Sequence, residues 1–136
     1  MTSKANLVSE QTQIMSGLDS VVIRQYNGGI TGGRTLDMTG FDFSRVEAGH
    51  VAIKVLDEDG KNYTYKPMPV KDGGYDEMPE GHKVAGVVVA SKPADYPLVG
   101  IMDDGRVNDE AMPYPLTEEL KTLFKSDLPN LIFEHD

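Results

Sequence analysis

Two short strand patterns joined by an acidic turn constrain the fold of this chain more than any other feature. Residues 51–56 alternate so that their valines and isoleucine share one face, which is typical of a strand. Residues 57–60 read Asp-Glu-Asp-Gly, and Asp-Gly accepts the positive φ angles of a tight hairpin turn. Residues 62–66 then form the partner strand, which Pro67 and Pro69 end because neither has an N–H to donate. The sequence therefore predicts a β-hairpin here.

A second group of strand patterns lies in the C-terminal half. Residues 84–90 form an almost continuous apolar run of strand length, which predicts a strand buried on both faces. Residues 98–102 form another strand pattern. The Asp-Asp-Gly of residues 103–105 predicts a turn that leads into a returning strand over residues 106–108.

One helix is expected near the C-terminal end. In residues 116–125 the apolar side chains recur at helical spacing and form a single stripe. Thr117 suits the N-cap, and two glutamates follow it where the helix dipole favours negative charge. Pro129 ends the helix, and residues 131–133 predict a short closing strand.

The N-terminal part has a different character. Residues 1–20 are mostly polar and fit neither the helix nor the strand pattern, so we interpret them as an extended arm or, alternatively, as a frayed terminus. Residues 21–26 predict the first strand, and the glycines that follow predict a flexible hinge. We therefore divide the chain into residues 1–29, the arm and first strand, and residues 30–136, a β-rich domain.

These elements, with 14 glycines and 8 prolines in 136 residues, favour many turns and few long helices. The expected class is mainly β (β-rich α+β). The expected architecture is a small compact β-barrel or β-tulip-like domain with one short helix near the C-terminal end and an extended N-terminal arm.

The charge of the chain restricts its partners. Thirteen lysines and arginines against 22 aspartates and glutamates give a net charge of −9, without a visible cluster of cations. We therefore expect no nucleic acid and no membrane partner, because phosphate backbones and anionic lipid surfaces repel such a chain. The chain has no cysteine, which excludes disulfides, thiolate zinc sites and a cysteine nucleophile. Residues 1–20 contain no apolar run of signal-peptide or membrane-spanning length.

Several motifs admit a chemical interpretation and a simpler one. The glycine-rich residues 28–34 resemble a phosphate cradle but lack the Lys-Ser/Thr ending of a P-loop, so we interpret them as the hinge. The acidic residues 57–59 lack the alternating oxygen ligands of a calcium loop and fit a solvated hairpin tip. His50, His82 and His135 have no metal-ligand spacing, and the first two follow glycines as turn residues do. We predict no catalytic, cofactor-binding or metal-binding residue and no enzymatic activity.

Tyrosines are numerous for a chain without tryptophan. Tyrosine gives a large amphipathic contact area at a small entropy cost, which suits an interface, although half-buried strand positions also explain each one. The candidate interface residues are Val21, Val22, Ile23, Tyr26, Tyr63, Tyr65 and Tyr114.

The order of the patterns resembles a known family. Residues 81–89 give a turn and a Gly-Val strand, residues 98–108 give an apolar strand with a central Asp-Asp-Gly, and residues 113–117 read Pro-Tyr-Pro-Leu-Thr before the helix. With the closing strand at 131–133, this order resembles the head decoration and head fibre proteins of tailed bacteriophages, in the style of the decoration protein of phage lambda. The similarity covers residues 30–136.

The resemblance implies an auxiliary capsid protein. Such a protein is made in the host cytoplasm, is located in the virion on the outer surface of the capsid, and stabilises the head across subunit junctions. It implies the major capsid protein as a partner and a homo-oligomer, with a trimer favoured. The arm would then add residues 21–26 to a capsid sheet edge. The alternative function is a small-ligand or carbohydrate-binding β module, in which tyrosines and acidic loop tips line a site.

Overall fold

The structure, a computed structural model, describes residues 19–136. The arm expected over residues 1–20 therefore lies almost wholly outside the described residues. A single turn of helix, α2 (Asp19–Val22), opens the described fold. Among the helices of residues 19–136, none is long and apolar enough to cross a bilayer.

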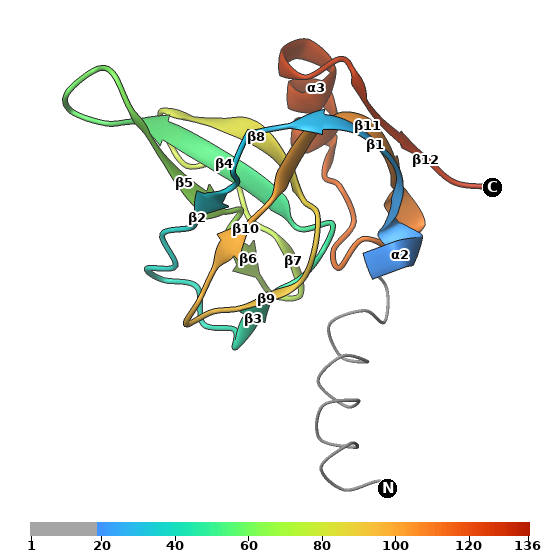
Figure 1. Cartoon of the computed structure of the whole chain (residues 1–136), viewed down its shortest axis with the longest axis horizontal. Helices are drawn as coiled ribbons and strands as arrows, with labels where there is room; N and C mark the ends of the chain where they lie inside the picture. Colours follow the sequence, from blue (N-terminus) through green and yellow to red (C-terminus); the bar gives the residue numbers. More distant parts are fainter. Residues whose placement is uncertain (1–18) are drawn as a thin grey trace, which may run out of the picture.

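An open sheet forms the body of the molecule (Figure 1). Across the sheet, the strands in order are β1 (Ile23–Gly29), β11 (Ile101–Asn108), β8 (His82–Val88), β4 (Val51–Leu56) and β5 (Tyr63–Pro67). A sixth strand, β12 (Leu131–Glu134), pairs with β11 in parallel. Because β1 and β5 remain edges, the sheet does not close into a barrel. The mainly β class with one helix near the C-terminal end is confirmed, while the expected barrel closure is absent.

Three two-stranded ribbons and two helices complete the described fold. The ribbons pair β2 (Arg34–Thr35) with β10 (Leu98–Val99), β3 (Arg45–Val46) with β9 (Lys92–Pro93), and β6 (Val70–Lys71) with β7 (Gly74–Tyr75). The 3-10 helix η1 (Asp109–Ala111) follows β11. The helix α3 (Glu118–Asp127) precedes β12, and Thr117 caps it by accepting a hydrogen bond from the N–H of Leu120, as the sequence predicts.

The hairpin of β4 and β5 is confirmed. Its strands pair in the expected antiparallel register from Ala52 opposite Pro67 to Leu56 opposite Tyr63. Pro67 is the last residue of β5, which agrees with its predicted role as a strand terminator. The apolar run in β8 is also confirmed as a strand buried on both faces, because Val84 to Val88 are all buried.

The predicted turn at residues 103–105 is wrong. These residues lie inside β11, which continues without a turn from Ile101 to Asn108. Gly105 has φ +151° and lies against the backbone of Gln25 in β1, where a Cβ would collide with the Gln25 carbonyl oxygen. The glycine therefore permits a close approach of two strands and not a change of direction.

The first strand also begins later than predicted. Residues 21 and 22 belong to α2, and β1 runs from Ile23 to Gly29 along β11. Val22 is fully buried in the core, so it is part of the fold and does not belong to an exposed surface.

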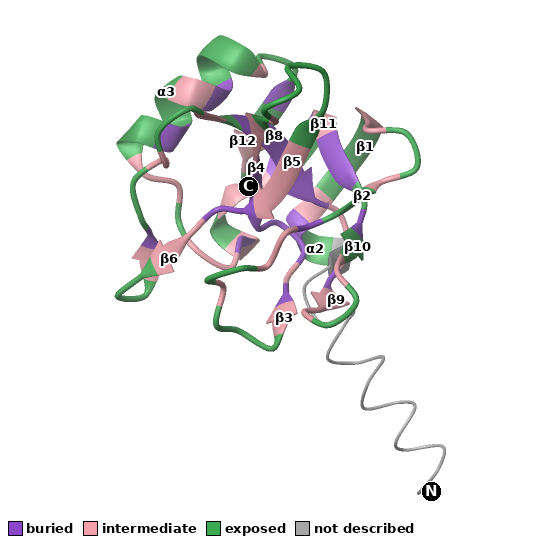
Figure 2. Cartoon of the chain, turned by 90° about the vertical axis from the view of Figure 1, so that its left-hand side faces the viewer, coloured by how far each residue is buried: buried purple, intermediate pink, exposed green. Residues whose placement is uncertain are grey.

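Two hydrophobic clusters cover the two faces of the sheet (Figure 2). Alternate residues of β4 divide between them, with Ile53 in the cluster beneath α3 and Ala52 in the other. Leu120 and Phe124 of α3 are buried in the first cluster and hold the helix against the sheet.

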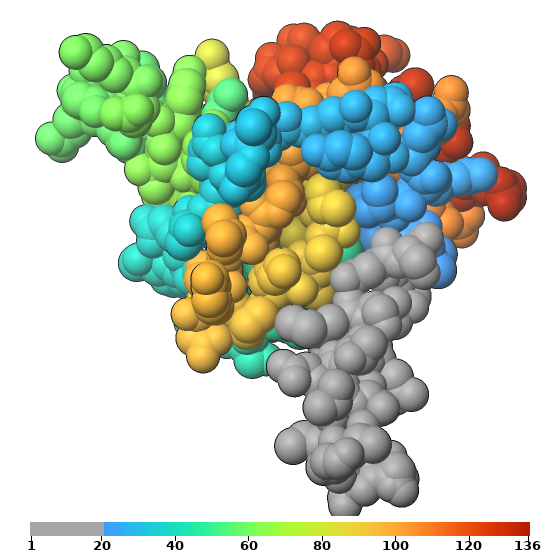
Figure 3. All heavy atoms as spheres, in the orientation of Figure 1, coloured from blue at the N-terminus to red at the C-terminus, as the bar shows by residue number. Residues whose placement is uncertain are grey.

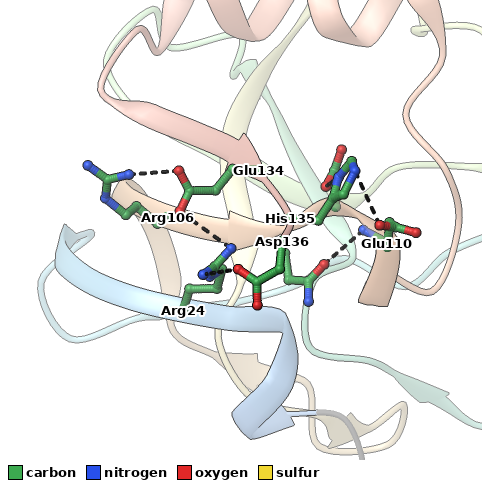
Figure 4. A network of polar contacts seen from close by, with 8 residues as sticks. Arg24, Arg106, Glu110, Glu134, His135 and Asp136 are labelled. Atoms are coloured by element: carbon green, nitrogen blue, oxygen red, sulfur yellow. Dashed lines mark hydrogen bonds and ion pairs between the residues drawn. The ribbon is translucent and has the colours of Figure 1, made fainter.

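Ion pairs join the end of the chain to β1 and β11 (Figure 4). Glu134 lies 2.7 Å from the guanidinium of Arg106 and 3.6 Å from that of Arg24. Arg24 also donates to Asp136 at 2.9 Å. The ends of β1 and β12 are thereby held beside the same end of β11.

Candidate interaction surface and pockets

The predicted interface residues are distributed over several parts of the molecule. Tyr26 is exposed on β1, and Tyr63 and Tyr65 lie on β5 at the opposite edge of the sheet. Tyr114 instead packs near the start of β4, against His50. Val21 is exposed and Ile23 is half-buried beside the core, next to the buried Val22. Of the predicted tyrosines, only Tyr63 and Tyr65 contact each other.

Tyr63 and Tyr65 belong to a surface in which rings and cations alternate. Their ring centroids are 6.4 Å apart. The Nζ atom of Lys54 lies 4.6 Å from the centre of the Tyr63 ring, and the Cζ atom of Arg34 lies 5.6 Å from that of Tyr65. Leu56 pairs with Tyr63 and is 48% exposed. We call these five residues (Arg34, Lys54, Leu56, Tyr63 and Tyr65) the aromatic–cation face.

Local structure positions the members of this face. In β4, Lys54 and Leu56 are two residues apart and point to the same side, where they meet their partners Tyr65 and Tyr63. The Arg34 guanidinium donates to the carbonyl oxygens of Thr31 and Gly33. These bonds hold the Arg34 side chain beside β5. Four of its five residues belong to the β4–β5 hairpin, which projects from the body of the molecule (Figure 3), and Arg34 comes from β2.

The cations of this face are available to a partner. Within the described part of the chain, neither Arg34 nor Lys54 has a carboxylate within 4.0 Å, and the same holds for Lys83, which pairs with Lys54 in the sheet. Cation–π contacts of this kind stabilise exposed pairs only weakly, so the cations can also bind an external anion. The face contains two cations on a chain of net charge −9.

Both edges of the main sheet are poor templates for strand addition. The N–H of Asp37 donates to the Tyr65 carbonyl at 2.8 Å, and Pro67 has no N–H, so much of the β5 edge is already used. The β1 strand follows β11 with three register shifts, and such irregularity also discourages pairing. The exposed side chains, and not the backbone, are therefore the main recognition groups of β5.

A pocket of about 150 Å³ lies near the start of β4. Aromatic side chains provide most of its walls, and its lining residues are Phe41, Phe43, Ser44, Arg45, Glu47, His50 and Tyr114. The ring of His50 makes edge contacts with Phe41 at 5.3 Å and with Tyr114 at 5.8 Å between centroids. Six of the seven lining residues fall within residues 41–50 and only Tyr114 is distant in the chain, but no local sequence pattern predicts how this loop folds around His50.

His50 is a buried, neutral histidine. Its Nε2 atom lies 2.9 Å from the carbonyl oxygen of Met68, which requires that Nε2 carry the proton and donate. Burial lowers the pKa of His50 to about 4, although the bond to Met68 opposes this shift. Burial likewise raises the pKa of the neighbouring Tyr75, whose hydroxyl oxygen accepts from the N–H of Val51. The pocket therefore presents uncharged rings at neutral pH.

A second pocket, of about 180 Å³, lies beyond Phe41. Its charged and polar lining residues are Asp37, Thr39, Lys66 and His82, and its other walls include Ile53 and three prolines. His82 follows a turn, as the sequence suggested, but its Nε2 atom is buried and has no hydrogen-bond partner within residues 19–136. No sequence pattern predicts this pocket, because its charged residues occupy ordinary strand and loop positions.

No group of three or more histidine, aspartate or glutamate side chains within the described residues is arranged to hold a metal ion.

Comparison of the chain with protein-family models, with curated proteins and with solved structures finds no match.

Proposed function

We propose that this protein is a non-enzymatic accessory of a tailed-phage head, which binds the outer capsid surface and stabilises it across subunit junctions. The order of its sequence patterns supports this proposal through the resemblance to head decoration and head fibre proteins. The structural observation that carries it is the aromatic–cation face, since tyrosine and arginine are enriched at protein interfaces and at their energetic centres.

The proposed mechanism is mechanical. Packaged DNA presses the shell outward, and a protein that spans a subunit junction adds contacts that must break before the subunits separate. An interface of standard size buries about 1,600 Å² in total and supports stable binding. Several copies in one homo-oligomer, with a trimer favoured, increase the effective concentration of each binding face without new contacts.

The partner is expected to be the major capsid protein, through an acidic region of its outer surface. The cations Arg34 and Lys54 provide attraction, while Leu56 and Tyr63 provide apolar contact. Because both sheet edges are obstructed, we expect the side chains of this face to contribute more than strand addition. Any contribution of residues 1–20 is a separate component of binding.

Titration of the purified protein onto expanded, undecorated heads tests the proposal. We expect saturable binding with a fixed copy number per head. We also expect at least tenfold weaker binding for Tyr63→Ser, because truncation of a residue at the energetic centre of an interface typically removes about 2 kcal/mol or more of binding free energy, roughly a 30-fold effect. Tyr96→Ser is the matched control, since Tyr96 is 68% exposed in the loop before β10.

Two results separate the components of binding. A chain that lacks residues 1–20 should remain folded, and its residual affinity measures what the face contributes alone. Unsaturable binding, or equal loss for the two tyrosine variants, contradicts the proposal.

A second candidate function rests on the pocket beside His50. Exposed aromatic rings stack on the C–H faces of sugars, and the rings of Phe43 and Tyr114 line this pocket with centroids 6.5 Å apart. A carbohydrate-binding module would show saturable shifts of Tyr114 resonances on titration with neutral monosaccharides. Binding to heads with no such shifts selects the capsid function over this one.

A further inference from the structure

The pocket beyond Phe41 is built on one face of three adjacent strands. In β4, Ile53 pairs with Lys66 of β5, and Val55 pairs with His82 of β8. Directly paired residues share a face, and Ile53 and Val55 are two residues apart, so Lys66 and His82 flank the same strip of β4. The loop after β2 places Asp37 over this strip through its bond to Tyr65.

His82 presents an unused hydrogen-bond acceptor at this pocket. Its Nδ1 atom lies 2.9 Å from the carbonyl oxygen of Glu80, so Nδ1 carries the proton and donates. In the neutral form of the ring, Nε2 is then an acceptor, and this atom is buried without a partner among residues 19–136. Because a buried polar atom without a hydrogen bond is unfavourable, a group that donates to Nε2 would be favoured in the pocket.

Asp37 and Lys66 give the pocket one charge of each sign. The side-chain and backbone bonds from Thr39 lower the pKa of Asp37, with a smaller contribution from the charge of Lys66, so this carboxylate is ionised at neutral pH. Only one of its oxygens, Oδ1, accepts those two bonds. Among the described residues, Lys66 has no carboxylate within 4.0 Å. The second carboxylate oxygen of Asp37 and the ammonium of Lys66 can therefore still bind a ligand.

Apart from Thr39, whose hydroxyl donates to Asp37, the remaining walls are apolar, and the space is small. Ile53 and Phe41 line the pocket together with three prolines, Pro67, Pro69 and Pro79. The volume of about 180 Å³ is below the 300–1,000 Å³ of sites for drug-sized molecules. A ligand of this site is therefore a compact molecule with an apolar body.

We propose that this pocket binds a free amino acid with a small aliphatic side chain. Its carboxylate would bind the Lys66 ammonium, and its own ammonium, which has three N–H donors, would serve both Asp37 and His82 Nε2. The aliphatic side chain would contact Ile53 and the proline walls. The end of a peptide carries only one of the two charges, so the site favours the free zwitterion.

Three ligands of nearly equal shape test the proposal on the unmodified protein. Valine carries both charges, isovalerate lacks the ammonium, and isobutylamine lacks the carboxylate. We expect saturable NMR shifts at Ile53 and His82 with valine, and at least about tenfold weaker binding of each analogue. Isobutylamine loses the bond to Lys66, and isovalerate loses the bonds to Asp37 and His82. No binding of valine, or equal binding of valine and either analogue, overturns the proposal.

Two variants test which charged group of the ligand Asp37 and Lys66 each bind. Asp37→Asn should reduce the preference for valine over isovalerate, with the remainder due to His82 Nε2, and Lys66→Met should abolish the preference for valine over isobutylamine. Lys71→Met is the control, because Lys71 is exposed on β6 outside the pocket and its removal should change neither preference. Retained preferences in both pocket variants would also overturn the assignment. Binding to phage heads plays no part in these measurements, so their outcome is independent of the proposed function.

Discussion

His135 Nδ1 lies 2.8 Å from Asp109 Oδ1 and joins the end of β12 to the helix η1. The other ring nitrogen, Nε2, lies 3.2 Å from Glu110 (Figure 4). The imidazolium form donates from both nitrogens, so this contact is complete only when His135 is protonated.

The pKa of His135 is raised, first by the hydrogen bond to Asp109 and then by the charge of Glu110. The folded state therefore holds this proton more tightly than the unfolded state. Its stabilising contribution is complete below the unfolded pKa of 6.5 and is lost as the pH rises through the folded pKa. An NMR titration of His135 should show a midpoint above 6.5, and Asp109→Asn should lower it. A midpoint at or below 6.5 in the unmodified protein contradicts this contact.

His50 has the opposite pH dependence. Between pH 6.5 and about 4 the unfolded chain binds a proton that folded His50 does not accept, so acidification through this window should destabilise the fold by about 3 kcal/mol. Urea unfolding at pH 7 and pH 4 should show this loss in the unmodified protein and in His135→Gln, but to a smaller extent in His50→Gln. The His50 resonances should also remain constant from pH 7 to pH 5, and a titration within that range would contradict the assignment.

Gly105→Ala should destabilise the fold by about 2–4 kcal/mol, because φ is +151° and a Cβ would meet the Gln25 carbonyl. Gly100→Ala is the matched control. A Cβ at Gly100 would have the Val89 side chain at an ordinary 3.6 Å, so its effect should stay within about 0.5 kcal/mol. Chemical denaturation of the two variants measures the difference, and similar stabilities would contradict the close approach of β1 and β11.

Thr117→Ala should cost about 1 kcal/mol, because it removes the acceptor for the N–H of Leu120 at the start of α3. Thr122→Ala, on the exposed side of the same helix, should change stability by less than about 0.5 kcal/mol. Urea unfolding provides both values. A larger loss at Thr122 than at Thr117 would show that the cap is not important for the helix.

The β4–β5 hairpin and α3 were predictable from sequence because local signals determine them. The Asp-Gly turn fixes the hairpin register, and the cap at Thr117 together with the apolar stripe fixes the helix. The same local rule failed at residues 103–105. Those residues pair with β1 on one side, Gly105 pairs with β12 on the other, and this long-range pairing overrides the turn preference.

The candidate sites were predictable only in part. Tyr63 and Tyr65 lie on one strand as the sequence predicts, and their cations were missed because Lys54 and Arg34 come from other segments. Strand order, which separates Tyr26 from Tyr63, cannot be derived from local patterns. His50 and His82 follow turns as expected, but their burial depends on loops that fold over them from distant positions.

The placement of the start of β1 and the end of β12 determines how the described fold responds to tension between these two points. Ile23 begins β1 beside Val107, and Glu134 ends β12 beside Asn108, so both strands can be pulled from the same end of β11. A force between these two points acts across the strands and opens their hydrogen bonds one after another, as in a zipper, at low force. A force applied through the β4–β5 hairpin is instead distributed along the whole length of β4. Under the proposed function, such a protein would resist separation best when it is not held by the start of β1 and the end of β12.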